Sequence, residues 1–315
     1  MDTLKTYLKR PCYWKHEIIP ILNTKINITS DHIKNINFYS GVNLEIIGIF
    51  EQYGYVYTYD DYKSIVQKSG YALEYISDDK KTDELCKLAV QRDGYALNYV
   101  PDDKKTDELC KLAVQRNGYA LNYVPEDKKT YELYKTAIEH DGHCLQYIDE
   151  NIRTNELYEN AIQQDGNILE YIAEDKKTEE LCKMAVQQHG CALKYVPEDR
   201  KTEELCKIAM QCGFALKYVP NNKKTNEICK LAVSKFGNAL YFVPKNKKTD
   251  KICKIAVKNN SCALQYVPKH KKTYKICMMA VYYDRYALQF VPKNKKKYIK
   301  LKFIKIKFRM TLYFI

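Results

Sequence analysis

The chain has 315 residues and a formal net charge of +13 at pH 7, with 52 lysines and arginines against 39 aspartates and glutamates. Hydrophobic residues make up 45% of it, but no apolar run reaches the length of about 18 residues that is typical of a transmembrane helix. The sequence begins MDTLKTYLKR, without the apolar stretch of a secretory signal peptide. We therefore expect an intracellular protein.

Residues 1–57 show no internal repetition. Pro11, Trp14 and Pro20 lie near the start, and the sequence from residue 26 onward is rich in Ile, Tyr, Phe and Val, with glycines as breaks. This composition allows short strands. We interpret residues 1–57 either as a cap on the first repeat or as a separate recognition module.

A unit of about 24 residues then recurs ten times between residues 58 and 296, and a fixed period of this length is the signature of a solenoid. The copies begin at Thr58, Thr82, Thr106, Thr130, Thr154, Thr178, Thr202, Thr225, Thr249 and Thr273. They are evenly spaced, except that the step from Thr202 to Thr225 is one residue shorter than the others. In a solenoid each repeat packs mainly on its neighbours.

The copy that begins at Thr82 shows how one unit should fold. Thr82 is a typical helix N-cap, and the two acids after it suit the positive end of the helix dipole. Residues 85–90 give an apolar stripe at helical spacing, and we expect Gly94 to end the helix in the left-handed conformation. Residues 95–100 predict a second, shorter helix, either α or the tighter 3₁₀ kind, which stops at Pro101. A polar turn leads to the next threonine.

The sequence thus predicts an all-α solenoid of about ten helix plus short-helix repeats. The repeat array covers residues 58–296, preceded by the cap or module of residues 1–57 and followed by a basic, apolar tail of residues 297–315. Between residues 299 and 308 the tail alternates lysine or arginine with Ile, Leu or Phe. This alternation favours an edge strand or a disordered tail over a helix.

Two residue types recur at fixed positions of the repeat. Seven of the twelve cysteines share one position, without CxxC or Cys/His spacing, so we expect them to pack as small apolar side chains in the core. They are Cys86, Cys110, Cys182, Cys206, Cys229, Cys253 and Cys277. An aromatic ring recurs at Tyr75, Tyr99, Tyr123, Tyr147, Tyr171, Tyr195, Tyr218, Phe242, Tyr266 and Phe290. We interpret the rings as a core spine, and a platform for stacking bases is the alternative.

The charge is distributed unevenly. Residues 82–201 have 16 basic and 24 acidic side chains, a net −8, and residues 202–315 have 26 basic and 5 acidic side chains, a net +21. In this basic third a lysine pair recurs once per repeat, while the turn before it loses its acids. The pairs are Lys223/Lys224, Lys247/Lys248, Lys271/Lys272 and Lys295/Lys296. In a solenoid they would form a ladder along one edge, which could contact a polyanion or an acidic protein, or could be a solvated face.

No pattern in the sequence indicates a reaction centre. The six histidines are scattered, and there is no P-loop, no GxGxxG and no GxSxG motif. We therefore expect no catalytic, cofactor-binding or metal-binding residues, no cofactor, and a protein that is not an enzyme.

The consensus T-x-E-L-C-K-x-A-V-x-x-x-G-x-A-L-x-Y-V-P-x-D-K-K resembles the repeats of domain of unknown function 4116, which are abundant in mimivirus-like giant DNA viruses. Residues 108–130 and 180–202 carry the resemblance most clearly. It implies a viral protein that acts inside the host cell, in the cytoplasm or in the virus particle. It brings no activity and no catalytic residues.

These observations leave two functions open. We expect a non-catalytic scaffold for protein–protein interaction, whose partner is an unidentified viral or host protein. The alternative is binding of nucleic acid or another polyanion through the basic repeats, in which case affinity should fall steeply with salt.

Overall fold

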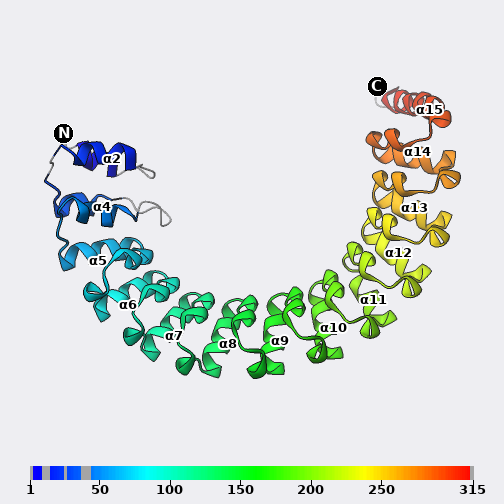
Figure 1. Cartoon of the computed structure of the whole chain (residues 1–315). Coiled ribbons are helices and arrows are strands. Elements are labelled where there is room, and N and C mark those ends of the chain that lie inside the picture. The colour runs from blue at the N-terminus through cyan, green and yellow to red at the C-terminus, as the bar shows by residue number, and fades with distance from the viewer. Residues whose placement is uncertain (1–2, 9–14, 25–26, 37–43, 313–315) are drawn as a thin grey trace. The chain divides into compact units, whose positions relative to one another are not determined.

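The computed structural model describes residues 3–8, 15–24, 27–36 and 44–312. Within these ranges the regular structure is helical and contains no strand, which confirms the predicted all-α class. The chain divides into two compact units, residues 1–160 (unit 1) and 161–315 (unit 2). In each unit, helices of successive repeats lie side by side (Figure 1).

The regular structure in the described part of residues 1–57 is helical, so the short strands that the composition allowed do not occur there. The helices are α1 (Thr3–Leu8), α2 (Lys15–Leu22), α3 (Ser30–Lys34) and α4 (Ile46–Gln52). In α4, Ile46, Ile47 and Phe50 are buried, a spacing that suits one helix face better than a strand. α3 contacts the first helix of the repeats. Pro11 and Trp14 lie outside the described residues.

Each repeat consists of one α-helix, a six-residue 3₁₀-helix and, in most copies, a three-residue 3₁₀-helix. The α-helices are α5 (Tyr59–Lys68), α6 (Asp83–Arg92), α7 (Asp107–Arg116), α8 (Tyr131–His140), α9 (Asn155–Gln164), α10 (Glu179–Gln188), α11 (Glu203–Ala209), α12 (Asn226–Lys235), α13 (Asp250–Asn259) and α14 (Tyr274–Tyr283). The six-residue helices are η2 (Gly70–Tyr75), η4 (Gly94–Tyr99), η6 (Gly118–Tyr123), η8 (Gly142–Tyr147), η10 (Gly166–Tyr171), η12 (Gly190–Tyr195), η14 (Gly213–Tyr218), η16 (Gly237–Phe242), η18 (Ser261–Tyr266) and η20 (Arg285–Phe290). The three-residue helices are η3 (Asp78–Lys80), η5 (Asp102–Lys104), η7 (Glu126–Lys128), η9 (Glu150–Ile152), η11 (Glu174–Lys176), η13 (Glu198–Arg200), η15 (Asn221–Lys223), η17 (Lys245–Lys247) and η19 (Lys269–Lys271).

The repeat folds locally as its sequence predicts. The hydroxyl of Thr82 accepts a hydrogen bond from the N–H of Leu85, at 3.3 Å, and so caps α6. In the apolar stripe of α6, Leu85, Cys86, Ala89 and Val90 are buried and Leu88 is half-buried. The apolar side of η4 is also buried. The seven repeated cysteines are all buried, as predicted. Burial raises the pKa of Cys86 and of Cys182 to about 11, so these thiols stay protonated at neutral pH.

Contrary to the sequence prediction, the repeat glycine does not end the α-helix in a left-handed conformation. α6 ends at Asp93, whose backbone is extended (φ −147°, ψ 114°), and Gly94 then begins η4. Among the described glycines, positive φ occurs at Gly54 alone, so the expected left-handed Gly94 was wrong. The repeat glycine is needed for close approach: a Cβ placed on Gly70 would lie 2.5 Å from the carbonyl oxygen of Ala89 in the next helix.

The copy that lacks one residue keeps the pattern with a shorter helix. α11 has 7 residues, where the α-helices of the other copies have 10. After its end at Ala209, the residues up to Cys212 turn into η14. The deletion is therefore absorbed in the last turn of the helix.

The tail is helical, so the expected strand or disordered segment was wrong over the described residues. α15 runs from Lys293 to Leu312, and so begins before the predicted tail. Its sequence has no glycine or proline and is rich in lysine, which is a good helix former. Ile299 is buried, and α15 contacts α14. Neither α15 nor another described helix has the length and apolar character needed to cross a membrane.

The close contacts of the repeat glycines predict that a side chain at these positions destabilises the protein. A Cβ on Gly118 would lie 2.6 Å from the carbonyl oxygen of Ala137 and 2.9 Å from the Cys144 sulfur. Gly118→Ala should therefore lower the free energy of unfolding by about 1–3 kcal/mol, because α8 must move away. Urea denaturation measures this change.

Gly48→Ala is the matched control, since a Cβ on Gly48 in α4 would meet nothing within 4 Å. There the change should be neutral or stabilising by up to about 1 kcal/mol, because alanine is the better helix former. Equal losses at both sites would show that close packing is not the role of the repeat glycine.

Candidate interaction surfaces

The lysine pairs proposed as a ladder are largely bound to the protein itself. The first lysine of a pair reaches back one repeat and donates to the backbone carbonyl of that repeat's second lysine. Lys223 Nζ lies 2.6 Å from the Lys201 oxygen, Lys247 Nζ lies 2.5 Å from that of Lys224, and Lys295 Nζ lies 2.5 Å from that of Lys272. Lys271 instead pairs with Asp250, at 2.9 Å. These ammonium groups thus connect adjacent repeats.

The second lysine of each pair has a different partner in the two parts of the chain. Where the turn is acidic, the ammonium forms an ion pair with the carboxylate three residues earlier. These pairs are Lys81–Asp78 at 2.7 Å, Lys105–Asp102 at 2.8 Å, Lys129–Glu126 at 2.6 Å, Lys177–Glu174 at 2.9 Å and Lys201–Glu198 at 2.6 Å. The lysines in them are almost covered and the acids are exposed, so the pairs anchor the turn.

In the basic repeats the second lysine has lost that carboxylate. Asn221, Lys245 and Lys269 stand at the acidic position. The ammonium groups donate instead to backbone oxygens of the next repeat: Lys224 to Phe242 at 3.3 Å, Lys248 to Tyr266 at 3.1 Å and Lys272 to Phe290 at 3.1 Å. Burial lowers the pKa of all three lysines. Desolvation without a counter-charge therefore disfavours their charged form.

The exposed positive charge of these turns lies at other residues. Lys245, Lys269 and Lys293 are exposed, whereas all eight lysines of the proposed ladder, including Lys296, are buried or half-buried. The sequence contained a signal for this difference, because these three lysines occupy the position that is acidic in the earlier repeats. The inward direction of the paired lysines could not be read from the sequence.

A second set of charges lies between neighbouring α-helices. In three junctions a lysine of one helix pairs with a glutamate in the first turn of the next: Lys63–Glu84 at 3.0 Å, Lys135–Glu156 at 3.2 Å and Lys207–Glu227 at 3.0 Å. At the α12–α13 junction the same two positions hold Lys230 and Lys251, and at the α13–α14 junction they hold Lys254 and Lys275. All four are exposed. We call these four residues the lysine row; no motif in the sequence marks them.

The repeated aromatic rings form a surface feature instead of a core spine. In unit 1, the tyrosine after each repeat glycine packs edge-on against the recurring tyrosine of the next repeat. The ring centres are 6.5 Å apart for Tyr71–Tyr99, 5.0 Å for Tyr95–Tyr123 and 5.9 Å for Tyr119–Tyr147. These six rings, which we call the tyrosine row, are half-buried. The core prediction was wrong because the buried positions of each 3₁₀-helix are its alanine and leucine.

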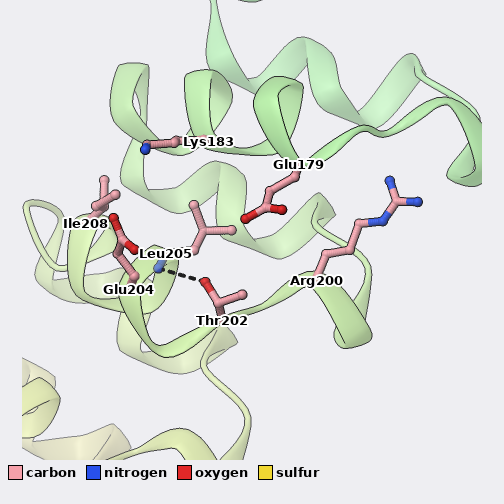
Figure 2. Close-up of a pocket in the computed structure, with 7 residues that line it drawn as sticks. All are labelled: Glu179, Lys183, Arg200, Thr202, Glu204, Leu205 and Ile208. Carbon is pink, nitrogen blue, oxygen red and sulfur yellow. Dashed lines mark hydrogen bonds between the residues drawn. The ribbon is translucent and has the colours of Figure 1, made fainter.

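One small cleft in unit 2 is too narrow to be a ligand site. It has a volume of about 40 Å³, far below the roughly 300 Å³ that a pocket for an organic ligand needs. Figure 2 shows that its Thr202 hydroxyl accepts a hydrogen bond from the Leu205 N–H, at 3.1 Å, as the cap of α11. The lining residues are Glu179, Lys183, Arg200, Thr202, Glu204, Leu205 and Ile208. The cleft has room for water but not for a substrate.

Across the described residues, no group of three or more His, Cys, Asp or Glu side chains is placed to hold a metal ion. His143 is explained locally, since its Nδ1 lies 3.1 Å from a carboxylate oxygen of Asp141. The features that the structure brings together are thus extended rows of side chains with a one-repeat period.

The repeated α-helix and 3₁₀-helices, stacked through glycine contacts, define an all-α repeat solenoid. The chain belongs to the family of the domain of unknown function DUF4116, whose family model matches nine overlapping segments that tile most of it. The segments are residues 62–103, 82–129, 106–153, 130–175, 154–201, 178–224, 202–247, 225–270 and 250–294. No curated protein and no solved structure gives a significant match.

Lys224 lacks the carboxylate that pairs with the equivalent lysine in the acidic turns, so we predict that adding one stabilises the protein. Asn221→Glu should restore the ion pair of the acidic turns and raise the free energy of unfolding by about 0.5–1 kcal/mol, because the ammonium is desolvated but the acid is exposed. The gain should be complete above the ordinary glutamate pKa of about 4.3 and be lost as the pH falls below it, through the lower pKa of the paired carboxyl. Thermal denaturation at pH 7 and pH 3 measures both.

Asn222→Glu adds the same charge one position further along and is the control. It should give less than half of the gain, since the acidic turns pair the buried lysine with the residue three positions earlier. An equal gain from both variants would mean that general charge balance, and not the local pair, stabilises the turn.

Proposed function

We propose that the chain is a non-catalytic scaffold that binds another polypeptide along the tyrosine row of unit 1. The observation that carries this proposal is the periodic, half-exposed set of rings on η2, η4, η6 and η8. Tyrosine is enriched in protein interfaces because a rigid ring buries much area at a small entropic cost and its hydroxyl can hydrogen-bond to a backbone.

The surroundings of the row support a polypeptide ligand. Asn98 and Asn122 are exposed and precede Tyr99 and Tyr123 in the sequence, so each of these rings has an exposed amide beside it in the chain. The hydroxyl of Tyr119 donates to Asp141 at 2.9 Å, which holds that ring in place. Pre-positioned rings lose less freedom on binding, and this favours affinity.

A site-specific cross-link tests the proposal. A photoreactive phenylalanine analogue in place of Asn98 or Asn122, in the full chain in its native cell, should give a covalent adduct with one polypeptide. The adduct should survive nuclease and should be weakened by Tyr95→Ala or Tyr119→Ala. The same analogue at Lys111, exposed on α7, is the control and should give no such adduct. Equal adducts at all positions, or adducts lost with nuclease, would reject binding along this row.

A second candidate function is polyanion binding by the basic repeats. The lysine row supports it, because Lys251 and Lys275 replace the acids that neutralise the equivalent lysines elsewhere. Like charges that face each other destabilise a junction, so an external anion placed between them would stabilise both the junction and the complex. The exposed Lys245, Lys269 and Lys293 add positive charge in the same repeats.

Salt titration of binding to a single-stranded oligonucleotide tests this second function. With Lys251→Glu/Lys275→Glu, which restores the ion pairs of other repeats, the slope of log affinity against log salt should fall by roughly 0.7 for each phosphate that is no longer bound. Lys87→Glu/Lys111→Glu makes the same charge change in unit 1 and should leave the slope nearly unchanged. Absence of binding at about 0.15 M salt, or equal effects of both variants, would contradict it.

The proposed setting is the cytoplasm of a cell infected by a giant DNA virus, or the virus particle itself. The resemblance of the repeats to those of such viruses supports it, together with the Asn-, Ile-, Lys- and Tyr-rich composition that AT-rich genomes encode. Immunolabelling of infected cells and of purified particles distinguishes these two locations.

A further inference from the structure

Two side chains meet at an equivalent place between many adjacent repeats. The residue after the glycine of one repeat contacts the residue before the glycine of the next. The contact joins Tyr119 Oη to Asp141 Oδ2 at 2.9 Å, Asn167 Oδ1 to His189 Nδ1 at 3.2 Å, and the rings of Phe214 and Phe236 at 4.2 Å. The first two contacts are hydrogen bonds between polar groups, and the third is a contact between two aromatic rings.

At one junction of unit 2 both partners are cysteines. Cys191 follows Gly190 at the start of η12, and Cys212 precedes Gly213 of η14. Their sulfur atoms are 3.0 Å apart, so they need to approach by only about 1 Å to reach the bond length of a disulfide. The backbones are also close, because a Cβ on the neighbouring Gly190 would lie 2.9 Å from Cys212 Cβ.

This pair differs from the cysteines of the core. The seven repeated cysteines are fully covered, and the Cys206 sulfur, for example, lies 3.9 Å from the carbonyl oxygen of Lys201. Cys191 and Cys212 are only partly buried, so a small oxidant can reach them. Burial and the neighbouring Cys212 raise the pKa of the Cys191 thiol to about 12. Because a thiolate reacts with peroxide far faster than a thiol, this raised pKa slows oxidation at Cys191, which therefore acts second, as the thiol that closes the bond.

We propose that Cys191 and Cys212 are a redox modification site, at which a peroxide forms a reversible disulfide between two adjacent repeats. The first thiol takes an oxygen atom from hydrogen peroxide to become a sulfenic acid, and one water is released. The second thiol then displaces the hydroxyl group as a second water, and the sulfur–sulfur bond forms. Two thiols are oxidised and one peroxide is reduced to two waters.

The disulfide would link two repeats at the position of α11, the shortest α-helix of the ten repeats. The step between these repeats contains α11, with 7 residues, and in a solenoid the stability of each junction depends on nearest-neighbour contacts. A covalent link from η12 to the turn before η14 would hold this junction closed while the thiol groups of the core stay reduced.

Peptide mapping of the purified full chain tests the proposal. After treatment with hydrogen peroxide, the intact mass should fall by two hydrogen atoms, and a peptide linking Cys191 to Cys212 should appear and vanish with dithiothreitol. The melting temperature should rise by roughly 5 °C, because the bond closes a loop of about 20 residues. Sulfinic acids, dimers or other cysteine pairs in place of this link would overturn the proposal.

Variants separate the bond from general oxidation. Cys191→Ser and Cys212→Ser should each abolish both the mass loss and the melting shift. Cys262→Ser, at another half-buried cysteine, should keep both. If a serine variant fails to fold, the cross-linked peptide of the unchanged chain still decides the matter, since its absence refutes the site.

Discussion

The structure depends on the close approach of an α-helix to the glycine of the preceding repeat, a contact that recurs along the array. At Gly70 and Gly118 the space for a Cβ is already occupied by the carbonyl oxygen of Ala89 or Ala137. This contact sets the distance between repeats and brings the alanine and leucine of each 3₁₀-helix into the core. Ser261 shows that one later junction accommodates a small side chain at this position. The tyrosine row, the lysine contacts and the cysteine pair all follow from this spacing.

Features that depend on short stretches of sequence were predictable. Thr82 caps its helix, most of the apolar stripe of α6 is buried, and Cys86 packs in the core, because each follows from the residue types within about one turn. The prediction that the recurring aromatic rings lie in the core was wrong. Hydrophobic periodicity does not distinguish a ring in the core from one that packs on a ring of a neighbouring repeat. Tyr99 meets Tyr71 across more than one full repeat of sequence, a contact that only the repeat spacing creates.

The candidate site was harder to predict for the same reason. Lys247 reads as a surface charge in the sequence, yet its partner is the backbone oxygen of Lys224, one repeat away. Gly94 has the sequence of a left-handed helix end, but the extended Asp93 already ends α6. In the tail, alternation in the sequence favoured a strand, whereas helix propensity and the contact with α14 gave a helix. A long-range contact decided the direction of Lys247, whereas the local backbone decided Gly94, and the tail depended on propensity and on a contact together.

The junctions between α-helices also differ in how they respond to dissolved ions. Opposite charges meet at the α5–α6 and α11–α12 junctions, whereas lysines occupy both positions at the α12–α13 and α13–α14 junctions. Mobile ions screen attraction and repulsion alike, so the first kind of junction weakens as the ionic strength rises and the second kind tightens. The difference in stability between the two kinds of junction therefore shrinks as the salt concentration rises.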